Sequence, residues 1–357
     1  MSIKSIVKYA VIIVISLALL IAAILVPKNE KAVLAGSGSG TNAEVESIED
    51  VYDLMTIVQG NLNVLSYGVG EITDYASAPS EEAKNYTSFT YVQTSNGKAS
   101  SNMSGSVAGK FSSAKASEKY ERNLTAYITE SASYFVCEVS NLHQSRSSVE
   151  GKTEKSRAYS SVVMHLYIAE EGAMIRFEKM ERMSDGKSSL GKMDKALGKW
   201  ISFSAEDGEF LAKVIHFFNF AFYDSYDLLS TLGSYMNDSE NFSGAGKVYQ
   251  LRKENEPHFF NSLISTHFGG SLASFNKDKD TGSFEINLSN GKVPQISMGL
   301  SGKVDEDEKI LGSSISVKSS TATFDKIYFK NVNNTVIDIS GIQAAMTAEE
   351  FVGLMED

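Results

Sequence analysis

The chain has 357 residues, with 33 lysines and arginines against 44 aspartates and glutamates, which gives a net charge of −11. Such an acidic surface repels phosphate backbones and anionic headgroups unless cations gather in a patch, and the sequence has no cluster of basic residues. We therefore expect no nucleic-acid partner. Cys137 is the only cysteine, which excludes an intramolecular disulfide and a multi-cysteine metal site. Its apolar neighbours predict a small buried side chain.

The N-terminal region predicts a membrane anchor. Residues 9–26 are apolar apart from Ser16, and a helix of this length spans about 27 Å, close to the thickness of a bilayer's hydrocarbon core. Lys4 and Lys8 precede the span without any acid, which predicts a short cytoplasmic N-terminus (residues 1–8) and an extracellular C-terminal domain at the cell membrane. Cleavage of a signal peptide after Ala35 is the alternative. It is disfavoured because this site lies far behind the apolar run.

Residues 27–45 predict a flexible linker, because Gly36 to Gly40 alternate only glycine and serine. Residues 46–357 then form the extracytoplasmic domain. Its first helix starts at a capping box, Ser47-Ile-Glu-Asp50, and carries an apolar face. Period-two alternation follows, first over residues 86–94, which we expect to end in a turn at Asn96-Gly97.

Further alternating segments continue the sheet and are interrupted by helices. The clearest hairpin surrounds Asn290-Gly291, a pair that favours a type I′ turn. A helical insert is expected at about 205–267, after the capping box Ser204-Ala-Glu-Asp207, and Thr347-Ala-Glu-Glu350 opens a terminal helix. This order predicts an α+β fold: a large antiparallel sheet with helices on one face, preceded by one N-terminal transmembrane helix.

The sequence offers little that resembles catalytic chemistry. His165 and His216 lie in apolar runs and are expected to be satisfied core or interface histidines. The segment 269–273 approaches a nucleophile elbow but ends in alanine, so a glycine-rich turn is expected there. Residues 276–282 hint at a calcium loop, but Thr281 replaces the required glycine, which favours a polar turn. We expect no enzyme activity, no metal site and no cofactor.

Three short motifs resemble the LolA-like superfamily of bacterial envelope lipoprotein-binding and lipid-binding proteins. Leu197-Gly-Lys-Trp-Ile201 is similar to the Gly-x-Trp strand before the helical lid, and Lys279-Asp-Thr-Gly282 is similar to a recurrent turn. Residues 323–330, running into 336–339, are similar to the closing strand pair. The resemblance covers roughly residues 46–340. It implies a curved half-barrel whose concave face, covered by helices, accommodates acyl chains without catalysis. The helical anchor departs from the family and argues against a shuttling carrier.

Two functions follow as hypotheses. The first is a membrane-tethered, non-catalytic domain that binds a lipid or another apolar ligand between sheet and helices. Its expected ligand-binding residues are the aromatics of the insert, Phe217, Phe218, Phe220, Phe222 and Tyr226. The alternative is an envelope protein-interaction or sensor module with a filled core, which needs an envelope protein partner. An enclosed apolar cavity would favour the first hypothesis over the second.

Overall fold

The computed structural model describes residues 34–67, 86–107, 110–188, 190–218, 221–268, 275, 278–310 and 313–356. The chain divides into two compact units, residues 1–34 with 338–342, and residues 35–337 with 343–357. In the smaller unit, residues 338–342 form a tight turn in which the Ile342 N–H donates to the Ile339 carbonyl at 3.0 Å. The predicted transmembrane segment, residues 9–26, lies outside the described residues, and no helix within them is long and apolar enough to cross a membrane.

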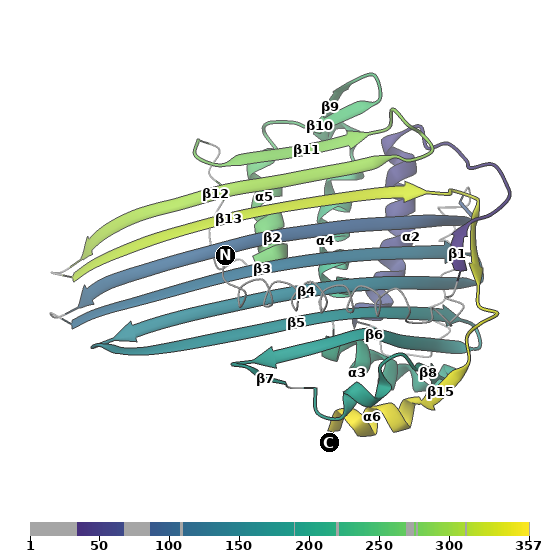
Figure 1. The fold of residues 1–357 in the computed structure, drawn as a ribbon. Coiled ribbons are helices and arrows are strands. Elements are labelled where there is room, and N and C mark those ends of the chain that lie inside the picture. The colour runs from purple at the N-terminus through teal and green to yellow at the C-terminus, as the bar shows by residue number, and fades with distance from the viewer. Residues whose placement is uncertain are drawn as a thin grey trace, which may run out of the picture. The chain divides into compact units, whose positions relative to one another are not determined.

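The larger unit is built on one sheet with unusually long strands (Figure 1). Natural strands usually have 3–10 residues, whereas the central ones here have 13 to 20. The long strands are β2 (Ser88–Val107), β3 (Lys110–Thr129), β4 (Ala132–Val149), β5 (Lys152–Ala169), β6 (Gly172–Ser184), β12 (Gln295–Ile310) and β13 (Ser313–Lys330). Shorter strands complete it: β7 (Lys187–Ser188), β8 (Trp200–Phe203), β9 (Phe242–Ala245), β10 (Val248–Leu251), β11 (Thr281–Asn287) and β15 (Ala344–Thr347).

The strand order is β15-β8-β6-β5-β4-β3-β2-β13-β12-β11-β10-β9, with β7 beside β6. Its ends, β15 and β9, are not joined among the described residues, so the sheet is open. Neighbouring strands are antiparallel except for the parallel pair β15 and β8. The predicted α+β class with a large antiparallel sheet is therefore confirmed. A separate two-stranded sheet pairs β1 (Leu34–Ser37) with β14 (Thr335–Asp338).

Five α-helices lie in the described part of the chain: α2 (Ile48–Tyr67), α3 (Gly208–Phe218), α4 (Ala221–Met236), α5 (Glu256–Phe268) and α6 (Ala348–Glu356). Three short 3₁₀ helices accompany them: η3 (Met193–Ala196), η4 (Ala205–Asp207) and η5 (Ser239–Asn241). All three predicted capping boxes are present, with reciprocal hydrogen bonds between Ser47 and Asp50, Ser204 and Asp207, and Thr347 and Glu350. A side chain satisfies an otherwise orphaned N–H at each helix start.

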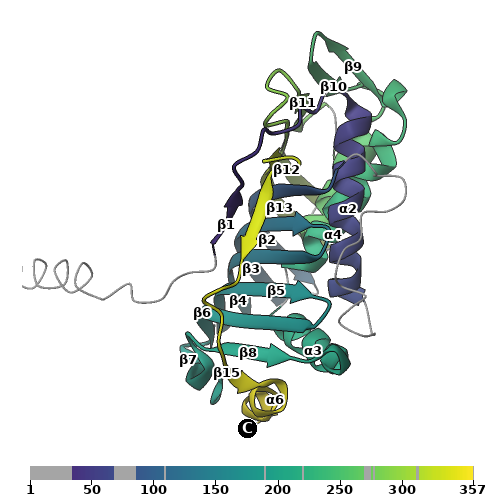
Figure 2. The same ribbon diagram turned by 90° about the vertical axis from the view of Figure 1, so that its right-hand side faces the viewer.

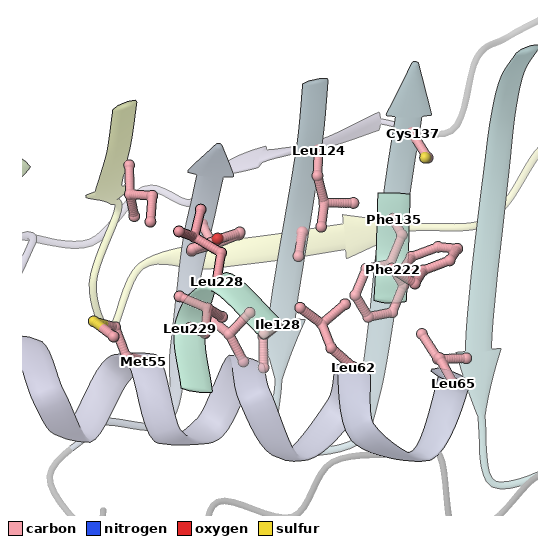
Figure 3. Packing of buried hydrophobic residues seen from close by; sticks show 14 of the residues in the cluster. Met55, Leu62, Leu65, Leu124, Ile128, Phe135, Cys137, Phe222, Leu228 and Leu229 are labelled. Carbon is pink, nitrogen blue, oxygen red and sulfur yellow. The ribbon is translucent and has the colours of Figure 1, made fainter. Parts of the chain in front are cut away.

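Helices α2, α3 and α4 lie on one face of the sheet (Figure 2). The alternating residues of the strands on that face, such as Phe135 and Leu124, are buried against the apolar side of these helices (Figure 3). Cys137 belongs to this core, as predicted, and burial raises the pKa of its thiol to about 12. Burial of this interface is the main source of stability for the larger unit.

The strands run well past the helices, which the sequence did not predict. We define the sheet extension as residues 98–107, 110–119, 142–149, 152–159 and 313–322 of five neighbouring strands. In β4 the first residues are buried and the last are exposed, and in β5 the order is reversed because the strand runs back. Figure 1 shows these strand ends reaching beyond the helical layer. The extension is therefore a sheet with no helix packed against it in the described structure.

The predicted turn at Asn96-Gly97 is wrong, because both residues pair within β2, with Glu121 and Tyr120 of β3. The Tyr120 ring lies over Gly97, where a Cβ atom would collide with it. Glycine is tolerated inside this strand because the aromatic ring covers the space that a side chain would occupy. The predicted hairpin around Asn290-Gly291 does form between β11 and β12. Its loop is longer than a two-residue type I′ turn, since Ile286 pairs with Ile296 and Asn287 with Gln295.

The segment expected to be a flexible linker makes ordered contacts from Leu34 onward. Beyond β1, the Asn334 amide nitrogen donates to the Gly40 carbonyl at 2.9 Å, and its oxygen accepts from the Gly40 N–H at 3.0 Å. The Val45 N–H donates to the Gly291 carbonyl at 2.8 Å. A glycine-rich chain has no side chains to pack, so its backbone groups are satisfied here by one buried amide. A domain cut at residue 46 would lose these bonds.

A glycine in β11 gives the first testable prediction. Gly282 pairs with Leu300, and a Cβ atom at this position would collide with the ring of Phe260 from α5. Phe260 is 1% exposed and packed against Phe259 and Phe275, so its ring has little room to shift. We expect Gly282→Ala to lower the free energy of unfolding by about 1–3 kcal/mol, measured by urea denaturation.

The control for this prediction is Gly353→Ala in α6, where no atom lies within 4 Å of the added carbon. It should be neutral or should stabilise the protein by up to about 1 kcal/mol, because alanine favours helices. Equal stability of Gly282→Ala and the parent protein would show that Phe260 moves aside freely.

Candidate functional site

The structure places the predicted ligand-binding aromatics differently from one another. Phe222 is 1% exposed and packs edge-on against Phe135, with ring centroids 5.6 Å apart. Phe217 and Tyr226 are half-buried against the same core, and the Arg182 guanidinium lies 4.9 Å from the centre of the Phe217 ring. The side chain of Phe218 and all of Phe220 lie outside the described residues. Phe222 is therefore part of the filled core. That the five aromatic residues bind a ligand together stays a prediction.

The interface between sheet and helices is filled where it is described. Figure 3 shows Phe222 between the side chains of α2 and those of β3 and β4, together with Leu62 and Leu65. Three hollows in the described structure have volumes of about 510, 360 and 410 Å³, and none of the three lies beneath α2, α3 and α4. The largest of them lies on the sheet extension.

The face of the extension that carries this hollow is opposite to the helical layer. Odd-numbered residues of β2, such as Phe89 and Tyr91, are buried in the helix-covered core. Because side chains alternate along a strand, the even-numbered residues Lys98, Ser100 and Asn102 point to the other side. We call this side of the extension the open face. Its hollow is lined by Ser100, Ser117, Ser320, Lys115, Arg146 and Lys318, among others.

The strand register arranges the open face in four rows, read across β13, β2, β3, β4 and β5. Row one is Ala322, Lys98, Lys119, Leu142 and Tyr159, and row two is Ser320, Ser100, Ser117, Gln144 and Arg157. Row three is Lys318, Asn102, Lys115, Arg146 and Lys155. Row four is Ser316, Ser104, Ser113, Ser148 and Thr153. Every lysine and arginine in these rows is exposed. The four rows contain no carboxylate, although acids outnumber bases in the whole chain.

Sequence reasoning missed this cationic surface because its lysines and arginines come from five strands, β2 to β5 and the distant β13. In β3 and β5 the cations of the four rows stand an even number of positions apart, as in Lys115-Ala-Ser-Glu-Lys119, which puts them on one face of the strand. That period-two pattern was the available signal. The pattern alone does not show which face of the sheet the cations share, because a shift of one residue in the strand register moves every side chain to the other face.

A second hollow adjoins the first on the same face. It has a volume of about 410 Å³ and is lined by residues that include Lys98, Lys119 and Phe324. Here Lys119 Nζ of row one lies 2.6 Å from Glu121 Oε1, which belongs to the next position along β3 on the same face, and the pair is exposed. The open face thus changes from cationic to mixed charge toward the helix-covered part of the sheet.

A cluster of ionisable residues lies on the face of the sheet away from the helices, in the part of the strands whose other face the helices cover. The Tyr134 hydroxyl and His165 Nδ1 are 2.6 Å apart, and Arg176 Nη2 lies 3.2 Å from Glu178 Oε1. Burial lowers the pKa of His165 and raises the pKa of Tyr134. His165 is therefore a satisfied histidine, as predicted.

His216 is exposed on α3, so it is not a core histidine, and the alternative of an interface histidine stays a prediction. The buried positions of that helix, Leu211, Val214 and Ile215, define a different side. Within the described residues, no group of three or more histidine, cysteine, aspartate or glutamate side chains is placed to hold a metal ion. Asn276 of the calcium-loop motif lies outside the described residues, and an Asp280 carboxylate oxygen accepts a hydrogen bond from the Lys303 N–H at 3.2 Å.

Comparisons with known proteins give no family. No family model matches the chain, and no curated protein matches it either. Among solved structures, the chain was aligned with a deltaS2 mutant of the TodX monoaromatic hydrocarbon channel at 5% identity, covering 83% of this chain and 97% of that one, with a TM-score of 0.20. The translocator domain of the autotransporter NalP from Neisseria meningitidis gives 9% identity, 66% and 88% coverage, and a TM-score of 0.12. A Pseudomonas aeruginosa FadL homologue gives 5% identity, 76% and 98% coverage, and a TM-score of 0.14. Likenesses this distant carry no inference about the fold or function of this chain.

Proposed function

We propose that this protein is a non-catalytic binding module of the cell envelope that engages its partner with the open face of the sheet extension. This is the hypothesis of an envelope protein-interaction module, with the open face assigned as its binding surface. One observation carries it: the strands continue far beyond the helices that stabilise them and form a hollowed face there. Strands with no core to cover add little stability of their own, so their length is better explained by what they contact.

The proposal keeps the predicted membrane placement. Residues 9–26 would hold the chain in the membrane, with residues 1–8 in the cytoplasm and the sheet domain outside the cell. The LolA-like resemblance and its curved half-barrel remain part of the proposal. They rest on the three motifs alone, since no comparison bears on them.

Lipid binding between sheet and helices is the second candidate. The observation that favours it is the incomplete burial of Phe217 and Tyr226, which lie on α3 and α4 at the edge of the core. Two half-buried aromatic side chains there could contact an acyl chain. The packed interior around Phe222 disfavours a ligand deeper in this interface, because a bound acyl chain needs volume that core side chains occupy.

Site-specific photo-crosslinking in intact cells tests the proposed surface. A photoreactive amino acid is placed at Ser117 or Gln144 in the hollow, and at exposed Ser230 on α4 as the matched control. We expect a discrete adduct from both hollow positions and none from Ser230. Adducts from Ser230 alone would contradict the proposal. A lipid that co-purifies at one per chain in native mass spectrometry would favour the second candidate.

A further inference from the structure

We propose that the open face binds a linear, non-nucleotide polyanion whose charges are phosphate groups, laid across the strands in the 510 Å³ hollow. This inference rests on the proposed function and names the class of partner. It is carried by the positions of the exposed cations, by the hydroxyls that line the hollow, and by the lack of carboxylates in the four rows.

The cations form a line perpendicular to the strands. In row three, Lys318, Lys115, Arg146 and Lys155 stand on β13, β3, β4 and β5, with Asn102 of β2 between the first two. Adjacent strands are about 4.8 Å apart, so the row spans about 19 Å. A chain with repeating negative charges that runs across the strands would meet one cation on nearly every strand.

Row two provides a floor of small polar groups beside this line. Ser320, Ser100 and Ser117 lie next to one another, and the Ser100 and Ser320 hydroxyl oxygens are 2.8 Å apart. Short side chains leave room for a ligand between the longer lysines and arginines. Serine hydroxyls donate to phosphate oxygens, and an arginine can donate two parallel hydrogen bonds to one phosphate.

The local charge opposes the charge of the whole molecule. The full chain carries −11, yet the described side chains of rows one to four include only cations among their charged groups. Beyond Lys318 the sheet continues into β12, where Asp305 is the backbone partner of Lys318. An anionic ligand is therefore attracted to the hollow and repelled by most of the remaining surface.

The same rows disfavour other anionic partners. Single-stranded nucleic acids bind by stacking bases on aromatic side chains, and Tyr159 is the only aromatic residue of the four rows. A flat bilayer surface would meet the rim of a hollow and leave its serine floor unused. A flexible phosphate chain without bases can instead follow the hollow.

The test measures binding of fluorescently labelled, short-chain inorganic polyphosphate to the full-length protein in a neutral detergent, over a series of salt concentrations. The test variant combines Lys115→Gln with Arg146→Gln. The control combines Lys253→Gln with Lys292→Gln, two exposed lysines outside the extension. We expect the test variant to bind about tenfold more weakly or worse, with the salt dependence of log K reduced by about one unit for each cation removed. The control should bind like the parent protein.

Thermal melts check that both variants fold, which we expect because all four side chains are exposed. Three results would overturn the inference: no binding of polyphosphate by the parent protein, equal weakening in the test and control variants, or equally tight binding of an oligothymidylate of the same charge. Binding of anionic vesicles that depends on Lys115 and Arg146, without binding of polyphosphate, would also overturn it. Crosslinked adducts from Ser117 without polyphosphate binding would refute this inference alone and leave the proposed function in place.

Discussion

Replacing Phe222 with alanine should lower the free energy of unfolding by about 3–5 kcal/mol, the usual range for truncating a fully buried phenylalanine. The ring is 1% exposed and meets Phe135 edge-on between α4 and the sheet. Truncation removes that aromatic contact and leaves a cavity that the surrounding side chains fill only in part. Urea denaturation of the full-length protein in a neutral detergent measures the loss.

The matched comparison is Tyr223→Ala at the adjacent position of α4. Tyr223 is 39% exposed, so its truncation should cost about 1 kcal/mol or less. The filled-core interpretation also expects that added lipid changes the melting temperature of neither the parent nor the Phe222→Ala variant. A small loss of stability in Phe222→Ala, joined to a lipid-dependent shift in the parent alone, would contradict it and would show that Phe222 contacts a ligand.

Local features of the fold could be predicted well from the sequence. The three capping boxes were identified because they depend on residues three positions apart, for example Ser47 and Asp50. The burial of Cys137 was predicted from its apolar neighbours in the sequence. These signals are short-range, so no knowledge of distant segments was needed to read them.

The length of the strands and the open face could not be predicted in the same way. Asn96-Gly97 has the composition of a turn, but Tyr120 covers the glycine and the strand continues through it. The cations of row three, Lys115, Arg146, Lys155 and Lys318, lie between 9 and 203 positions apart in the sequence. Only the register of four strand ladders aligns them in one row. Register depends on the packing of the whole sheet, which local periodicity does not specify.

The largest electrostatic effect is expected at an ion pair that joins β3 to α4. Arg122 Nη1 lies 2.9 Å from Asp224 Oδ2, and the two side chains are only 11% and 16% exposed. The Arg122 guanidinium also lies 4.2 Å from the centre of the Tyr120 ring. Removing one member leaves the other charge in a place where water solvates it poorly. We therefore expect Asp224→Ala to cost about 3–5 kcal/mol of unfolding free energy.

An exposed ion pair on the same strand provides the control. Lys119 and Glu121 are 2.6 Å apart, but their side chains are 62% and 56% exposed. Lys119→Ala should cost about 1 kcal/mol or less, because solvent screens the pair, and the small effect should shrink further in high salt. The cost of Asp224→Ala should change little with salt, since mobile ions do not reach a pair that is mostly buried.

Replacing both partners separates the cost of an unpaired charge from the value of the pair itself. We expect Arg122→Met combined with Asp224→Leu to be much closer in stability to the parent than Asp224→Ala is, because no charge is then left buried. Urea denaturation of the two single variants and the double variant gives the coupling energy directly. If the double variant were as unstable as the single ones, the ion pair would itself be needed to hold α4 against β3. If Asp224→Ala cost less than about 1 kcal/mol, water would be solvating Arg122 and the pair would behave as a surface contact.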